Sequence, residues 1–244
     1  MRGEFMSLKQ AAEHVQIDAN ELKHAAQRGE VDASVRGGEW YFDHAALDEW
    51  AQRSLLASNA SAIANRHRAF DERRRRERRP GVGIGALLVA ESIDLSVPAK
   101  AKAGMIRDMT DLADRSGFVY DPSALFKSLV EREEAASTAV GEGVAFLHPK
   151  YHDSYVFEQS FVAYGRSERP IFFGAPDGGA TRHFFLICST DHEQHLHVLA
   201  RLAVLAHGTN LVELLDAAET PEDVLAAVAQ CEDEFIGEQR HAAP

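Results

Sequence analysis

Near its middle the chain reads Gly141-Glu142-Gly143-Val144-Ala145-Phe146-Leu147-His148-Pro149-Lys150. Four consecutive apolar residues stand between a pair of glycines and a His-Pro step. A short apolar run bounded by turn residues is typical of a strand that is buried on both faces of a sheet. Residues that directly follow such strands lie at an edge where ligands commonly bind. We therefore expect a buried strand that delivers the imidazole of His148 to that edge.

Further helices and strands flank this run in an α/β order. Apolar residues recur at helical spacing in several segments, and short apolar runs predict additional strands. Pro122 suits a first helical turn, and Thr220 suits an N-cap before Pro221. The expected helices are Lys100–Ser116, Pro122–Glu134, His195–Leu205 and one that begins at Pro221, and the expected strands are Ile93–Leu95, Phe161–Gly165 and Phe184–Cys188.

The composition of the chain argues against some classes of function. The chain has 244 residues, of which 45% are hydrophobic and 26% charged, as expected of one large or two modest globular domains. Its formal net charge of -12 argues against general nucleic-acid affinity, so any DNA contact must be local. No apolar run approaches the roughly 20 residues of a bilayer span, and a signal-peptide pattern is missing. We expect a cytoplasmic protein without membrane contact.

No metal or cofactor is predicted. Cys188 and Cys231 are the chain's two cysteines, and they show neither close pairing nor metal-ligand spacing. Gly178-Gly179 is interpreted as a turn, because the lysine of a phosphate-binding P-loop is missing. The opening residues Met1–Phe5 resemble an addition made during cloning and are left out of the fold prediction.

Charge divides the chain into three segments. Residues Arg66–Arg79 hold 8 basic and 3 acidic side chains, whereas both flanking parts are acidic. Such a run is typical of a solvated connector, although a basic helix beside a DNA-binding module could touch phosphates. We predict a first domain over residues 6–54, a basic linker over 55–90 and a second domain over 91–240.

The first domain shows two short helices, a hairpin and a third helix. Asp18 and Glu21 form something like a capping box, and Asp43 is placed to cap the last helix. The pattern Gly-Gly-x-Trp-x-Phe over residues 37–42 predicts the hairpin. This order resembles the excisionase and MerR-like winged helix-turn-helix family. The resemblance implies DNA contacts from Lys23, His24, Arg28 and Arg36. The alternative is a retained fold used for dimerisation or for docking a protein.

The second domain resembles enzyme IIA of the phosphotransferase system, in its fructose, mannitol and nitrogen-regulatory class. Four motifs over about residues 91–232 carry the resemblance. The first motif is Arg132, in the helix before Ser137-Thr138. The second is Gly-x-Gly-Val-Ala-x-x-His, which follows Ser137-Thr138 and ends at His148. The remaining two are a Phe-Gly-Ala-x-Asp-Gly loop and the pair His195-Leu196 followed by Leu199-Ala200. The family usually has a proline before the active histidine, where this chain has Leu147. The resemblance implies a mixed sheet flanked by helices.

The resemblance also implies that His148 accepts a phosphoryl group from the phosphocarrier protein HPr, with His195 and Arg132 beside it. Chemistry supports such a role independently, because a neutral imidazole has a nitrogen lone pair that can attack phosphorus and leave again. An N–H of His195 and the guanidinium of Arg132 would stabilise charge on the phosphoryl oxygens.

Several of these residues also have an ordinary structural interpretation. Arg132 could form an ordinary ion pair on a helix surface, and Ser137 and Thr138 could cap a turn instead of lining a phosphate pocket. His197 is expected on the surface, because helical spacing points it away from His195.

Three functions compete at this stage. The first is a regulatory phosphohistidine carrier, with HPr as donor and a sugar-specific enzyme IIB or a regulated target protein as receiver. The second is a DNA-binding transcription regulator whose enzyme IIA-like domain is a non-catalytic sensor or forms a homodimer. The third is an adaptor that docks a partner without phosphate chemistry.

Overall fold

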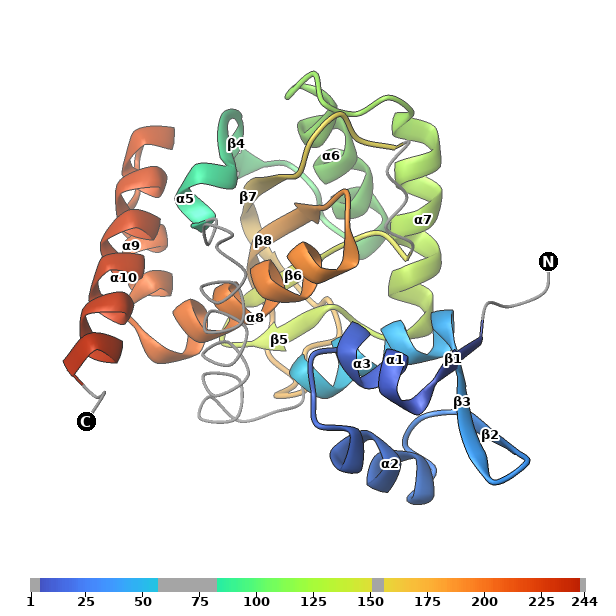
Figure 1. Cartoon of the computed structure of the whole chain (residues 1–244). Helices are drawn as coiled ribbons and strands as arrows, with labels where there is room; N and C mark the ends of the chain where they lie inside the picture. The colour runs from blue at the N-terminus through green and yellow to red at the C-terminus, as the bar shows by residue number, and fades with distance from the viewer. Residues whose placement is uncertain (1–4, 57–82, 151–155, 242–244) are drawn as a thin grey trace. The chain divides into compact units, whose positions relative to one another are not determined.

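The computed structural model describes residues 5–56, 83–150 and 156–241. The chain divides into two compact units, Met1–Arg79 and Pro80–Pro244, and each is described by itself (Figure 1). The predicted connector Arg66–Arg79 lies outside the described residues. Helix α3 runs to Leu56 and strand β4 begins at Leu88, so the two ends of the predicted 55–90 linker belong to regular elements.

Over residues 5–56, the first unit combines three helices with a small antiparallel sheet. Ser7 and Gln10 form the capping box of the first helix, Asp18 caps the second, and Asp43 accepts a hydrogen bond from the N–H of Ala46 in the third. The strand order is β1-β3-β2. The elements are β1 (Phe5–Ser7), α1 (Leu8–His14), α2 (Ala19–Gln27), β2 (Ala33–Arg36), β3 (Glu39–Asp43) and α3 (His44–Leu56).

Leaving Phe5 out of the fold prediction was wrong. Phe5–Ser7 pairs with β3, with Phe5 opposite Asp43, and the guanidinium of Arg36 lies 4.6 Å from the centre of the Phe5 ring. A three-residue strand carries too little pattern to be recognised in sequence, so only its partner strand reveals it.

The second unit is built on a five-stranded mixed sheet of order β4-β7-β8-β6-β5. The pairs β4 with β7 and β6 with β8 are parallel, whereas β7 with β8 and β5 with β6 are antiparallel. Leu147, the last residue of β6, stands opposite Leu186 of β8. The strands are β4 (Leu88–Val97), β5 (Ala139–Gly141), β6 (Val144–Leu147), β7 (Phe161–Ile171) and β8 (Thr181–Cys188).

Helices cover both faces of this sheet (Figure 1). On one face, α6 and α7 pack on a core that includes Ala163, Phe184 and Leu186. The remaining helices cover the other face, where α10 and α5 contact β4 and α8 contacts β8. A sheet covered on both sides explains why its strands read as apolar runs. The helices are α5 (Ile84–Leu87), α6 (Lys102–Asp114), α7 (Pro122–Ala135), α8 (His192–Gly208), α9 (Leu211–Ala217) and α10 (Pro221–His241).

The predicted α/β fold is confirmed, including the buried strand before His148 and the N-terminal Pro122 of α7. Helices α5 and α9 were not predicted, because they are only 4 and 7 residues long. Among the described helices, none is by itself long and apolar enough to cross a bilayer. Helices α8 and α9 pass that test only as a pair bent by 82°, and most of α8 is buried in the core.

Gly165 of β7 allows α6 to approach the sheet closely. A Cβ atom at this position would lie 2.5 Å from the sulfur of Met109 and 3.0 Å from a methyl carbon of Val97. Both side chains are buried, so neither can turn into solvent to make room. The close approach therefore requires a residue without a side chain.

We expect Gly165→Ala to lower the free energy of unfolding by about 1–3 kcal/mol, the usual cost of overpacking a core. Gly208→Ala is the matched control, because the nearest atom to its new methyl group lies 3.9 Å away. Urea denaturation of both variants measures the difference. Equal midpoints for the two variants would contradict the close-approach argument.

Candidate functional site

His148 directly follows β6 at the carboxyl end of that strand. The two residues before the strand have positive φ angles, 51° at Glu142 and 77° at Gly143, which close a tight turn from β5. The side chain is fully buried. The buried strand thus delivers the imidazole where the sequence predicted, but into an enclosed site.

Two hydrogen bonds define the protonation state of the His148 ring. Arg132 Nε lies 2.9 Å from His148 Nε2, and His148 Nδ1 lies 2.8 Å from the carbonyl oxygen of Phe146. A guanidinium N–H can only donate, and a carbonyl oxygen can only accept. The ring is therefore the neutral tautomer with its proton on Nδ1 and its lone pair on Nε2, and that lone pair faces the guanidinium.

Arg132 is buried, so its interpretation as a surface ion pair is wrong. It lies in the last turn of α7 and its Nη1 also donates to the carbonyl of Ala136, at 2.9 Å. The neighbouring Glu133 forms an ion pair: its carboxylate lies 2.7 Å from Lys102 Nζ and accepts hydrogen bonds from the N–H and hydroxyl of Thr138. These bonds fix the end of α7, and so the position of Arg132.

His195 lies in the first turn of α8, which Asp191 caps. Its ring centre is 4.9 Å from that of His148, with an angle of 50° between the ring planes, and its side chain is also buried. The two imidazoles, 47 residues apart in the chain, therefore meet with Arg132 in one cluster. A nitrogen lone pair can act as a nucleophile, and a guanidinium and a second imidazole can stabilise developing negative charge, so the cluster is chemically suited to carrying an acidic group on nitrogen.

Ser137 and Thr138 face protein groups in this conformation. The Ser137 hydroxyl donates to the carbonyl of Phe173 at 2.8 Å, and the Thr138 hydroxyl donates to Glu133 at 2.6 Å. Both bonds secure the loop between α7 and β5. A role in lining a phosphate pocket stays a prediction for these two residues.

The Phe-Gly-Ala-x-Asp-Gly loop is tied to the turn that precedes His148. The Asp177 carboxylate accepts hydrogen bonds from the N–H of Gly179 at 2.8 Å and of Glu142 at 3.0 Å. These two N–H groups lower the pKa of Asp177. Asp177 thus links two of the motifs that are widely separated in sequence.

Comparisons with known proteins identify the family to which the second unit belongs. Residues 86–231 match the family model described as "Phosphoenolpyruvate-dependent sugar phosphotransferase system, EIIA 2", which is more than half of the chain. The chain belongs to this family. Its second unit, Pro80–Pro244, is called the EIIA domain below.

Curated relatives of the EIIA domain include transport components and regulators. It is similar to the fructose-specific EIIA component of Haloferax volcanii, at 34% identity over 152 residues, 60% of this chain and 97% of that protein. A nitrogen regulatory protein of Bradyrhizobium diazoefficiens is 32% identical over 149 residues, 60% of this chain and 94% of the relative. The match to the fructose-specific EIIABC component of Bacillus subtilis is 29% identical and spans 23% of that longer protein.

Solved structures of the family have the same fold. The nitrogen regulatory protein IIA-Ntr of Neisseria meningitidis superposes with a TM-score of 0.54 and 28% identity, covering 59% of this chain and 98% of that one. The Escherichia coli mannitol enzyme IIA, solved in a complex with phosphorylated enzyme IIB, gives a TM-score of 0.52 at 21% identity. It covers 59% of this chain and 99% of that one.

His197 is buried in the EIIA domain, so its predicted surface position is wrong. Every residue of α8 from His195 to Ala206 is buried. Helical spacing does point His197 away from His195, but the helix has no solvent face on which it could lie.

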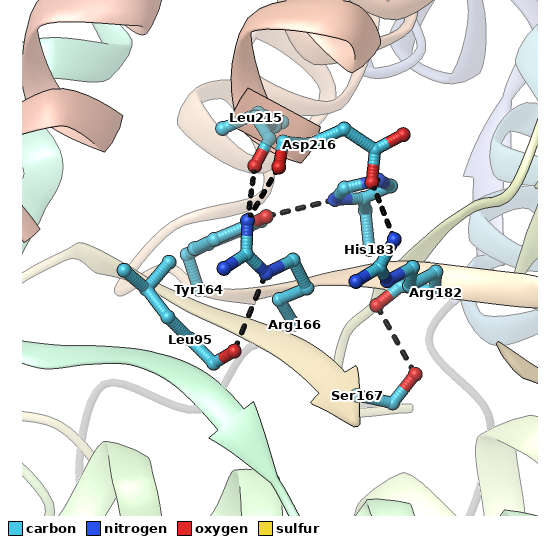
Figure 2. A network of polar contacts seen from close by, with 8 residues as sticks. All are labelled: Leu95, Tyr164, Arg166, Ser167, Arg182, His183, Leu215 and Asp216. Carbon is cyan, nitrogen blue, oxygen red and sulfur yellow. Dashed lines mark hydrogen bonds and ion pairs between the residues drawn. The ribbon is translucent and has the colours of Figure 1, made fainter. Parts of the chain in front are cut away.

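A second polar network in the EIIA domain was not predicted from sequence (Figure 2). The Tyr164 hydroxyl lies 2.8 Å from His183 Nδ1, and Asp216 of α9 lies 3.4 Å from His183 Nε2 and 2.9 Å from Arg182 Nη1. Burial lowers the pKa of His183 to about 4, so its ring is neutral at pH 7. Burial also raises the pKa of Tyr164. The neutral ring therefore accepts a hydrogen bond from the Tyr164 hydroxyl at Nδ1 and presents its Nε2–H to Asp216.

Arg166 completes this network. Its Nη1 donates to the carbonyls of Leu215 at 2.8 Å and of Asp216 at 3.0 Å, near the end of α9, and its Nε donates to Leu95 of β4 (Figure 2). The last carbonyls of a helix have no partner within it, so a cation there satisfies them. The network fastens α9 to the sheet and lies apart from the His148 cluster.

The four predicted DNA-contact residues belong to the first unit, which the family model does not reach. Lys23 and His24 lie on α2, half-buried and exposed respectively. The Arg28 guanidinium is held by Glu30 through two bonds, of 2.5 and 3.0 Å. Arg36 lies over the rings of Phe5 and Tyr41. Two of these four side chains, those of Arg28 and Arg36, are thus engaged within the unit.

We expect long-range ¹H–¹⁵N NMR of the EIIA domain in the full-length chain to show His148 as the tautomer with its proton on Nδ1. Arg132→Ala should remove the hydrogen bond to Nε2 and move that nitrogen's signal, whereas the exposed His24 should give an unchanged signal and serves as the internal control. A resting His148 with its proton on Nε2 would be incompatible with the geometry described above.

Proposed function

We propose that the chain is a phosphoryl carrier of the phosphotransferase system, which receives phosphate from HPr on Nε2 of His148. One observation carries the proposal: the Nε2 lone pair of His148, the Arg132 guanidinium and the His195 ring converge at one strand end. The curated relatives, which include a fructose-specific EIIA component and nitrogen regulatory proteins, support the same chemistry.

Transfer forms one N–P bond and breaks another. Nε2 of His148 attacks the phosphorus of the donor's phosphohistidine, and the donor nitrogen recovers the electron pair of the bond that breaks. The proton stays on Nδ1, where the carbonyl of Phe146 accepts its hydrogen bond and stabilises the positive charge that develops on the ring. No metal ion has a role in these steps.

Arg132 has to change partner in this reaction. Its Nε–H lies on the lone pair that must attack, and the His148 side chain is not exposed. The guanidinium therefore leaves Nε2 as the donor approaches, and its N–H groups are then free to bind the oxygens of the incoming phosphoryl group. His195, at the capped start of α8, lies within reach of the same oxygens.

A regulatory role is the form of this function that we favour. No sugar-binding element is apparent among the described residues, and a separate unit precedes the EIIA domain. We infer that the phosphate on His148 changes what this chain binds, with an enzyme IIB or a regulated protein as the next partner.

Incubation with phosphorylated HPr should add one acid-labile phosphoryl group to the wild type and none to His148→Ala, as intact-protein mass spectrometry would show. His195→Ala and Arg132→Lys should retain the acceptor but lose roughly 10²- to 10³-fold in rate, the usual cost of losing one donor to a developing charge. His207→Ala, at a half-buried histidine on the same domain, is the matched control. An unlabelled wild type, or label on His148→Ala, refutes the proposal.

DNA binding by the first unit is the second candidate function. Helices α1 and α2, the β2–β3 hairpin and α3 follow one another in the order of a winged helix-turn-helix, and α2 presents Lys23 and His24. Glu30 opposes this function, because it neutralises Arg28 and would repel a phosphate.

If this unit binds DNA, a gel shift with a short duplex should weaken as salt rises and disappear in the double variant Lys23→Ala, Arg28→Ala. Lys9→Ala removes one positive charge from an exposed position on α1 and should leave the shift nearly unchanged. A wild type that shifts no duplex at low salt excludes DNA as the partner of this unit.

A further inference from the structure

Two histidines and an aspartate converge in the first unit, away from the residues used above. His14 ends α1, His44 begins α3, and Asp48 lies one turn further along α3. One side-chain atom from each of the three lies within 4.8 Å of the other two. All three residues are partly buried. Spacing in the sequence gives no hint of this cluster, because the first and second histidines are 30 residues apart.

Hydrogen bonding accounts for only part of the arrangement. His14 Nε2 lies 2.6 Å from one carboxylate oxygen of Asp48, a normal hydrogen bond. His44 Nδ1 faces the other carboxylate oxygen at 3.7 Å, which is too long for a hydrogen bond. The two rings, with centres 4.6 Å apart, are tilted by 46° rather than stacked. Both nitrogens are thus directed at one carboxylate, and only one of them is bonded to it.

We propose that His14, His44 and Asp48 bind a divalent transition-metal ion of the zinc class. Tetrahedral Zn²⁺, with bonds of about 2.0–2.1 Å, separates its ligand atoms by about 3.3 Å. The three donor atoms lie within 4.8 Å of one another, so they have to approach each other by at most about 1.5 Å to reach that spacing. His44 and Asp48 are four residues apart on α3 and so lie on the same face of that helix, and His14 of α1 supplies the third ligand.

The donor set selects the class of ion. Two imidazoles and one carboxylate suit zinc and its neighbours among the transition metals, whereas Mg²⁺ and Ca²⁺ prefer oxygen ligands alone. Three protein ligands leave a fourth position for water or for another donor. The ion replaces the proton shared by His14 and Asp48, since the ligating nitrogen must be deprotonated.

Binding at this site would join the end of α1 to the start of α3. These helices flank α2, whose relation to α1 sets the geometry of the predicted helix-turn-helix. The ion should also stabilise the first unit, because the three ligands are brought together only in the folded state and the ion therefore binds that state preferentially. The site is independent of His148, and its failure would leave the proposed phosphate chemistry untouched.

The test uses the full-length chain after treatment with a chelator. Titration with ZnCl₂ against a chromophoric chelator should give one ion per chain, and CoCl₂ should produce the visible absorption of a tetrahedral site. His14→Ala, His44→Ala and Asp48→Asn should each weaken binding at least roughly tenfold. His24→Ala, an exposed histidine of the same unit, should bind as the wild type does.

Tryptophan fluorescence supplies a second readout. Both tryptophans of the chain, Trp40 and Trp50, belong to the first unit, so their emission follows its unfolding alone. Zn²⁺ should raise the thermal midpoint of the wild type and leave that of His44→Ala unchanged. The His44 side chain is 41% exposed, so His44→Ala should fold even if His14→Ala does not. A wild type that binds no more Zn²⁺ than His44→Ala, or binding lost through His148→Ala, overturns the proposal.

Discussion

The imidazole of His148 lies between a group that can only donate and a group that can only accept. Arg132 on one side and the Phe146 carbonyl on the other leave one tautomer and one ring orientation. Much of the EIIA domain serves to hold these two partners: Glu133 anchors the end of α7 to Lys102 and Thr138, and the Asp177 loop anchors the turn before β6. The chemistry of the site follows from this fixed ring.

Sheet topology explains how residues distant in sequence meet. Strands β6 and β8 are parallel neighbours, so their carboxyl ends reach the same edge. His148 follows the first strand directly, and His195 follows the second after a short turn and the Asp191 cap. The apolar runs and the capping residues were therefore enough to predict an α/β unit with a buried strand before His148, whereas the mixed sheet and the meeting of the two histidines were implied by the resemblance to enzyme IIA.

Other features depend on tertiary contacts that local sequence patterns do not predict. The burial of Arg132 and His197 depends on tertiary packing, and the three neighbouring glutamates made Arg132 resemble a surface residue. Phe5–Ser7 is a strand only because β3 is available to pair with it. The cluster of His14, His44 and Asp48 joins α1 to α3, and the spacing of apolar residues in the sequence does not predict that these two helices meet.

Helix α8 is enclosed along twelve consecutive residues, from His195 to Ala206. An element buried in this way has no room to shift by itself, because any displacement would open voids among tightly packed neighbours. His195 is therefore held at a fixed position beside His148. In the proposed phosphoryl transfer, any adjustment of the cluster falls to the long side chain of Arg132, so each exchange of phosphate would need little motion of the backbone.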